Sequence, residues 1–211
     1  SVYLMTMGQG DQVWERFGHN AIGIRDRRAN TDFVYNWGIF SFSQPGFVGR
    51  FLYGEMMYWM APGDAAASIV DYVTLNRTVE IQELNLSPAQ RLVLLEFIQW
   101  NAREENRFYR YDYFLDNCST RVRDALDRVL GGAIRQASEH DTTAMSYRDH
   151  ALRLMAEDRL MAVGVDIGLG RPTDRPITGW EEMFIPMKVR DRLREVRVPD
   201  ETGRLVPLVT S

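Results

Sequence analysis

The hydrophobic pattern of the chain changes its period within one stretch, residues 108–129. Over residues 108–115 the side chains alternate between two faces, which is the two-residue period of a β-strand. Beyond Cys118 the apolar residues recur with helical spacing, at Val122, Ala125, Leu126 and Val129. Asn117 is a favourable N-cap, so the sequence predicts a strand followed by an amphipathic helix whose first turn contains Cys118.

Strand-like and helix-like patterns follow one another along the rest of the chain. Strands are predicted over Val2–Met7, residues 21–24 with His19 at the entry, residues 32–37 and residues 78–84. The second and third of these are expected to pair as an antiparallel hairpin. Helical spacing indicates helices over residues 64–73, Pro88–Asn101, a stretch after Ser146, and residues 186–196. Capping patterns are predicted at Asp64, Ser87, Ser146 and Thr178. Residues 164–176 are punctuated by glycine and proline, and we expect a loop there. This order predicts the α+β class, with a small antiparallel sheet and additional helices towards the C-terminus.

The composition is that of an ordinary folded domain. The 211 residues are 45% hydrophobic and 26% charged, which allows one domain with a substantial core. The formal net charge of −4 offers no basic surface for DNA or RNA, so nucleic-acid binding is set aside. No uninterrupted apolar run approaches the length of a membrane span. A single cysteine excludes an internal disulfide, which fits the cytosol and does not exclude the periplasm.

The predicted position of Cys118 suggests catalysis. In the first turn of a helix, free backbone N–H groups and the positive end of the helix dipole stabilise a thiolate. A lowered thiol pKa makes cysteine a nucleophile at neutral pH, and the same N–H groups can bind the oxyanion of a tetrahedral intermediate. The alternative is a structural cysteine, since free cysteine is among the most buried residue types. A histidine partner elsewhere in the chain would favour catalysis.

Three histidines are candidates for the base. His140 lies in a polar run and is expected at the surface. His150 lies among charged neighbours of a predicted helix and is expected at the surface or in a capping role. His19 stands at a strand entry beside a glycine, where its ring can reach a cleft. We therefore predict a Cys118–His19 pair. Its order along the chain is the reverse of the papain order and fits a circular permutation of that arrangement.

A third polar group is expected to orient the other nitrogen of His19. Asn36 is the first candidate because its amide oxygen can accept from the imidazole, and Tyr35 and Asp116 are the alternatives. Tyr35, Asp116 and Arg121 are also the residues expected to contact the substrate. Arg121 lies one helical turn beyond the cysteine, where it either neutralises a lipid headgroup or forms a structural salt bridge.

Residues 41–62 are rich in glycine and aromatic side chains and do not alternate cleanly. Such a segment fills a core, lines an acyl-chain groove or contacts a bilayer surface. Filling a core is the more common use of side chains of this kind.

Four stretches of the chain resemble one known family. They read FGHNAI (residues 17–22), VYNWGIF (34–40), WNAREENRFYRYDYFLDNCSTR (100–121) and TGWEEMFIP (178–186). Together they are similar to the periplasmic domain of the Lnb family, bacterial lipoprotein N-acyltransferases, and the similarity runs from about residue 2 to residue 196. The most specific part is the DNCSTR block together with the upstream FGH. That family resembles, in turn, permuted NlpC-type thiol enzymes and the lecithin–retinol acyltransferase group.

The resemblance implies a permuted papain-like (NlpC-type) domain over residues 1–198, with residues 199–211 as a tail or linker. It implies Cys118 as nucleophile and His19 as base of an acyltransferase that needs no cofactor and no metal. Members of the Lnb type move an acyl chain from the diacylglyceryl group of a lipoprotein onto its N-terminal amine. The expected partners are a lipoprotein or phospholipid and a membrane surface. The expected location is the periplasm or the outer face of the bacterial membrane, with no signal peptide in the chain.

Two other functions are compatible with the same residues. A cysteine peptidase or amidase acting on cell-wall peptides would use the same Cys–His dyad, with a polar cleft in place of an apolar groove. A non-catalytic binding module would bury Cys118 without a path to solvent, or hold it too far from His19 for proton transfer.

Overall fold

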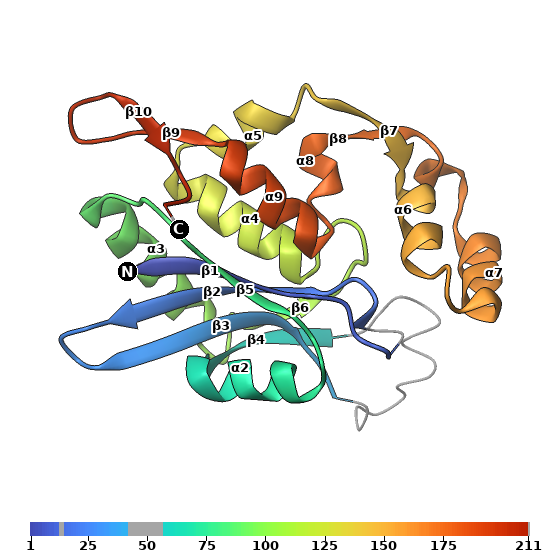
Figure 1. Cartoon of the computed structure of the whole chain (residues 1–211), viewed down its shortest axis with the longest axis horizontal. Helices are drawn as coiled ribbons and strands as arrows, with labels where there is room; N and C mark the ends of the chain where they lie inside the picture. Colours follow the sequence, from blue (N-terminus) through green and yellow to red (C-terminus); the bar gives the residue numbers. More distant parts are fainter. Residues whose placement is uncertain (13–14, 42–56, 211) are drawn as a thin grey trace.

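A six-stranded antiparallel sheet forms the centre of the fold (Figure 1). The computed structural model describes residues 1–12, 15–41 and 57–210. The strands are β1 (Val2–Met7), β2 (His19–Asp26), β3 (Thr31–Ile39), β4 (Met57–Asp64), β5 (Val79–Glu83) and β6 (Phe108–Arg110). They lie in the order β5-β1-β2-β3-β4-β6, and each neighbouring pair is antiparallel. The predicted hairpin of β2 and β3 is therefore confirmed.

Helices cover both faces of this sheet (Figure 1). In the described residues they are α2 (Ala65–Thr74), α3 (Pro88–Asn101), α4 (Cys118–Val129), α5 (Ala133–Ser138), α6 (Tyr147–Leu154), α7 (Arg159–Gly168), α8 (Gly179–Glu182) and α9 (Pro186–Glu195), with a 3-10 turn, η2, at Arg171–Thr173. α4 lies on one face and α2 on the other, while α3, α5 and α9 pack around α4 (Figure 1). The predicted α+β class, with a small antiparallel sheet packed against the Cys118 helix, is confirmed.

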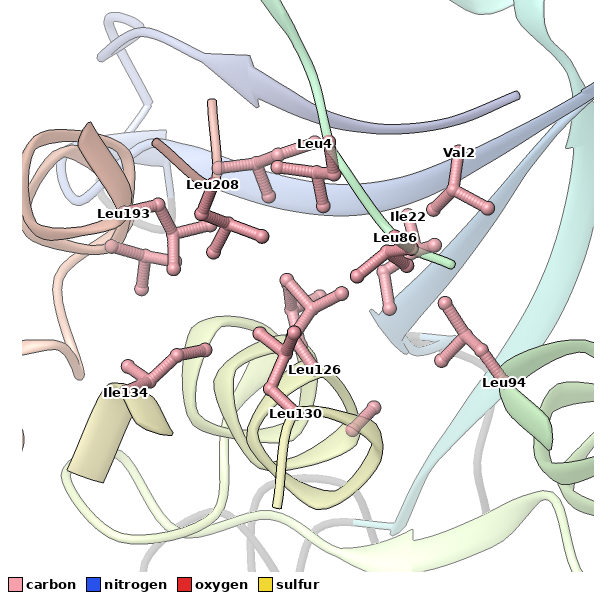
Figure 2. Packing of buried hydrophobic residues seen from close by; sticks show 14 of the residues in the cluster. Val2, Leu4, Ile22, Leu86, Leu94, Leu126, Leu130, Ile134, Leu193 and Leu208 are labelled. Atoms are coloured by element: carbon pink, nitrogen blue, oxygen red, sulfur yellow. The ribbon is translucent and has the colours of Figure 1, made fainter. Parts of the chain in front are cut away.

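The main core lies between the sheet and α4. Leu4 of β1, Ile22 of β2 and Leu126 of α4 are fully buried there and point towards one another (Figure 2). On the other face of β2, Ala21 belongs to a smaller cluster beneath α2. Burying one leucine side chain contributes roughly 2 kcal/mol. This layer therefore holds α4, and with it Cys118, firmly against the sheet.

The helix caps follow the sequence prediction closely. Capping side chains are provided by Asp64, Ser87, Asn117, Ser146 and Thr178. α4 ends before Gly131 and Gly132, whose φ angles of 64° and 86° lie in the left-handed region that favours glycine. Such signals depend on a few neighbouring residues, which explains why the sequence predicts them well.

The strand predicted over residues 108–115 is shorter than expected. β6 ends at Arg110, and the chain then turns because the Asp112 carboxylate accepts hydrogen bonds from the N–H groups of Phe114 (2.9 Å) and Leu115 (2.8 Å). The alternating tyrosines thus continue through a turn that leads from the edge of the sheet into α4.

Two predictions for the C-terminal part also need correction. Residues 164–176 are predicted as a loop, but α7 continues to Gly168, since one glycine inside a helix costs only about 1 kcal/mol. Residues 199–211 are predicted as a tail. In the structure β9 (Arg197–Pro199) pairs with β10 (Leu205–Pro207), and Leu208 is fully buried in the main core.

The remaining two strands, β7 (Thr142–Ser146) and β8 (Pro176–Thr178), pair with each other outside the main sheet. Together with α6 and α7 they form the outer part of the molecule (Figure 1).

Candidate active site

Cys118 occupies the first turn of α4, as predicted. The side chain of Asn117 caps this helix, and its Oδ1 accepts hydrogen bonds from the N–H groups of Ser119 (2.8 Å) and Thr120 (2.9 Å). Its Nδ2 donates to two backbone carbonyls, each at 2.9 Å, so the cap is fixed from both sides. The cap does not bind the N–H of Cys118 itself.

The thiol of Cys118 lies where the first turn of α4 meets the beginning of β2. There the imidazole of His19 and the backbone N–H of Asn20 lie close enough to the sulfur to lower the pKa of the thiol. The hydroxyl of Ser119 lies 3.8 Å from Sγ. Gly38 of β3 borders the same place, because a Cβ added there would stand 3.5 Å from the Cβ of Cys118. The fold thus brings the predicted pair into contact.

These contacts shift both pKa values in the direction that charges the pair. Burial by itself raises the pKa of the Cys118 thiol, but the charge and hydrogen bond of His19, with the Asn20 N–H and the Ser119 hydroxyl, lower it below its ordinary value. Burial likewise opposes the charge of His19, yet the Cys118 thiolate and Asn36 raise the pKa of the imidazole. The result favours a thiolate–imidazolium pair, the nucleophilic form of a cysteine.

Asn36 is the candidate third member that the structure brings to the histidine. Its Oδ1 lies 3.1 Å from Nε2 of His19, across the antiparallel pairing of β2 and β3. The alternative from the same strand, Tyr35, packs against the main core instead. Because successive residues of a strand point to opposite faces, Asn36 and Tyr35 cannot both face the imidazole.

Asp116 and Arg121 bind each other. The guanidinium donates from Nε and Nη2 to the two carboxylate oxygens of Asp116, at 2.6 and 2.7 Å. It also lies on the ring of Tyr109, 3.7 Å from the centroid. Of the two roles expected for Arg121, the structure therefore shows the salt bridge. Both residues, together with Trp37, line a cavity of about 480 Å³ one helical turn from Cys118.

Tyrosines surround the thiol. For Tyr58, Tyr109, Tyr111 and Tyr113, burial raises the pKa and the charge of the Cys118 thiolate raises it further, so all four rings are near the sulfur and stay neutral. The rings of Tyr58 and Tyr111 stack with centroids 4.1 Å apart. Of the aromatic segment 41–62, Tyr58 belongs to this tyrosine wall, whereas residues 42–56 lie outside the described residues.

Sequence reasoning missed the residues behind His19. Tyr72 of α2 stacks on the imidazole, with centroids 6.5 Å apart and an angle of 18° between the planes. The guanidinium of Arg77 lies over the Tyr72 ring at 4.6 Å and donates to the carbonyl of Gly8 at 2.9 Å. Its positive charge acts against the upward shift of the His19 pKa. No local motif links these residues to His19, because the packing of α2 on the sheet creates the contact.

The other two histidines differ from each other. His140 is exposed, as predicted, but His150 is buried, with only 1% of its surface exposed. Its Nε2 lies 3.1 Å from the carboxylate of Glu182, which Lys188 also contacts at 2.9 Å. The surface prediction for His150 is wrong because α6 turns its charged sequence neighbours to other faces of the helix.

In the described part of the chain, no helix has the length and apolar character needed to span a bilayer. Comparison with known proteins gives one family match: the model of the Lnb N-terminal periplasmic domain matches residues 1–153, which include Cys118, His19 and Asn36. No curated protein and no solved structure matches the chain. Because the match covers well over half of the 211 residues, the chain belongs to the family of Lnb N-terminal periplasmic domains.

Proposed function

We propose that this domain is a cysteine-dependent acyltransferase acting on lipid esters. It moves an acyl chain from the diacylglyceryl group of a lipoprotein to an N-terminal amine through a thioester on Cys118. The observation that carries the proposal is the contact of Cys118 with His19, together with the 3.1 Å contact of His19 with Asn36. Membership of the Lnb family supports a lipoprotein-related substrate.

In the first step His19 takes the thiol proton. Asn36 Oδ1 is an acceptor, so the neutral ring carries its hydrogen on Nε2 and leaves Nδ1 to receive the proton of Cys118. The thiolate attacks the ester carbonyl carbon, which forms a C–S bond and an oxyanion. The amides of Ser119 and Thr120 are already bound by the cap, so the N–H of Cys118 is the helix donor for that oxyanion.

In the second step the tetrahedral intermediate collapses and the ester C–O bond breaks. The imidazolium of His19 gives its proton to the departing glyceryl oxygen, which leaves a lyso-lipid hydroxyl and an acyl thioester on Cys118. An amine then attacks the thioester, His19 accepts the amine proton, and the sulfur leaves as a thiolate. One ester becomes one amide, and the balance requires no oxidant or reductant.

The surroundings of the thiol support a lipid substrate and an enzyme. Tyrosines that stay neutral form an apolar, water-excluding wall suited to an acyl chain. The charge of the nearby Arg121 is compensated by Asp116, which does not favour the carboxylate of a peptide substrate. Cys118 is half-buried and contacts His19, and this supports a catalytic role over a sealed binding module.

The test is intact-protein mass spectrometry after brief exposure to a diacylated lipopeptide. We expect an acyl-sized mass increase on the wild type that hydroxylamine removes, and none on Cys118→Ala. Since rapid turnover can deplete the thioester, the lipopeptide is weighed in the same experiment, and its acyl chain is mapped to the ester or the amine. A protein without adduct and a lipopeptide with every acyl chain in place would contradict the proposal and direct attention to cell-wall peptides.

A further inference from the structure

Helix α7 carries large apolar side chains that the described part of the protein leaves uncovered. No residue of α7 is buried, and the exposed fractions are 85% for Leu160, 56% for Val163 and 80% for Ile167. Their spacing of three and four residues places them on one face of the helix. Contiguous apolar surfaces of this kind in soluble proteins mark contact sites for another apolar phase or molecule.

Polar contacts hold α7 in place beside this face. Arg148 of α6 donates to the carboxylate of Asp166 at 2.7 Å and to the carbonyl of Leu169 at 2.8 Å. α6 is the main neighbour of α7, which lies at the periphery of the molecule (Figure 1). The helix is therefore fixed in orientation, while the described residues leave its apolar face uncovered.

Cations stand at both ends of this apolar face. Arg159 opens α7 and Arg171 follows it in η2, and neither has an ion-pair partner in the described residues. The acid next to Arg159, Asp158, is engaged as the N-cap through the N–H of Met161 at 3.0 Å. An apolar helix face with unpaired arginines at its ends suits the interface of a bilayer, where the arginines meet lipid phosphates.

Helix α7 lies at the end of the molecule that holds the thiol site (Figure 1). α6 and α7 stand beyond the end of the sheet at which β2 begins and α4 has its first turn (Figure 1). A salt bridge of 2.6 Å joins Arg16, three residues before His19, to Glu157, two residues before α7. The segment leading to the histidine and the segment leading to α7 are thus directly connected.

We propose that Leu160, Val163 and Ile167 of α7 insert into the surface of a lipid bilayer and so hold the thiol site beside lipid esters. That α7 holds the site beside lipid esters rests on the proposed function, but the contact of α7 with a bilayer does not depend on catalysis. A second copy of the chain is a poorer occupant. A ten-residue helix is about 15 Å long and 10 Å wide. The area of one of its faces is therefore far below the roughly 800 Å² that each partner buries in a stable interface.

The experiment is sedimentation of the full chain with vesicles of phosphatidylcholine and phosphatidylglycerol in equal parts. We expect the wild type to bind, and the double variant Leu160→Glu/Ile167→Glu to bind at least tenfold more weakly. Leu92→Glu is the matched control, because Leu92 is 57% exposed on α3, and it should bind as the wild type does. Melting temperatures establish that all three proteins are folded.

A second measurement does not depend on the folding of the double variant. Val163→Cys in a Cys118→Ala background carries an environment-sensitive fluorophore, whose emission should shift to the blue when vesicles are added. Absence of vesicle binding by the wild type, equal binding by the double variant, or a dye that stays in water would each overturn the inference. So would a dimer in light scattering that the double variant abolishes, since the occupant would then be a second copy.

Acyl transfer separates this inference from the proposed function. The double variant should transfer from a detergent-dispersed lipopeptide at the wild-type rate, and at least tenfold more slowly from a lipopeptide held in vesicles. If no variant transfers in either form while vesicle binding still depends on α7, the proposed function fails and the docking inference stands.

Discussion

His19 is half-buried and His150 is fully buried, and each has a partner that gives it different properties. His19 contacts a thiol, whose ionisation the histidine favours by taking its proton. His150 contacts the carboxylate of Glu182, whose pKa is lowered to about 2 by His150 and Lys188 against the effect of burial. The first pair is suited to passing a proton between its members, whereas in the second the Glu182 carboxylate keeps its charge at neutral pH.

The comparison indicates how the partner of a histidine separates a candidate base from a structural residue. A thiol and an imidazole near each other differ little in proton affinity, so small changes around them move the proton. A carboxylate bound by Lys188 and His150 has no such freedom, and its contacts join α6, α8 and α9. We therefore expect the two histidines to respond differently to the same substitution.

Replacing the thiol should have the largest effect on activity. Cys118→Ser keeps the size of the side chain but removes the thiolate, so acyl transfer to the lipopeptide should fall by about 10³-fold or more. The melting temperature should hardly change, because the hydroxyl is close in size to the thiol. A large loss of melting temperature with activity retained would mean that Cys118 is a structural core residue like any other.

His19→Ala should come next. The substitution removes the contacts that lower the pKa of Cys118, while burial continues to raise it, so the pKa must move upwards. Alkylation by iodoacetamide near pH 7 should slow at least tenfold, and the pH at which the rate rises should shift to higher values. Equal alkylation profiles for the variant and the wild type would remove His19 from the mechanism.

His150→Ala should show the reverse behaviour. Removing one partner of the buried Glu182 carboxylate should destabilise the fold by about 3 kcal/mol, measured by urea denaturation. Alkylation of Cys118 and its pH profile should not change. If His150→Ala altered the profile as strongly as His19→Ala, the two histidines would not be separable in function.

Much of this comparison depends on contacts that local sequence does not encode. The N-cap at Asn117 and the capping box at Ser87 involve side chains within four residues of each other, and the sequence predicted both. The burial of His150 depends on α8 and α9, which follow it by about thirty residues or more along the chain. Charged sequence neighbours were therefore a poor guide to its environment.

The candidate site likewise contains residues that local sequence predicts and residues that it does not. Cys118 and His19 were predicted because one begins a helix and the other a strand, and both positions leave local signals. Tyr72 and Arg77 belong to the opposite face of the sheet and reach His19 only through the packing of α2. The turn made by Asp112 competes with a strand by a side-chain hydrogen bond, which the two-residue period of the tyrosines concealed.

Lowering the pH should sharpen the contrast further. The pKa of Glu182 in the fold, about 2, lies below its ordinary value of 4.5. Its stabilisation is therefore complete above pH 4.5 and is lost as the pH falls from 4.5 towards about 2. The melting temperature of the wild type should fall more steeply over this range than that of Glu182→Gln. Parallel curves would show that the Glu182 carboxylate does not stabilise the fold.

Asn36→Ala should have the smallest effect and distinguishes orientation from proton transfer. Without the amide oxygen 3.1 Å from Nε2, His19 loses the acceptor that fixes its ring and favours its charged form. The rate of acyl transfer should fall about tenfold, and the pKa of the imidazole should decrease.

Asn36→Asp supplies an acceptor of similar shape with a negative charge, so it should raise the pKa of His19 above that of the wild type and shift the pH profile in the opposite direction. Since a packing role alone would give the two variants the same profile, shifts of opposite sign would identify Asn36 as the residue that orients His19.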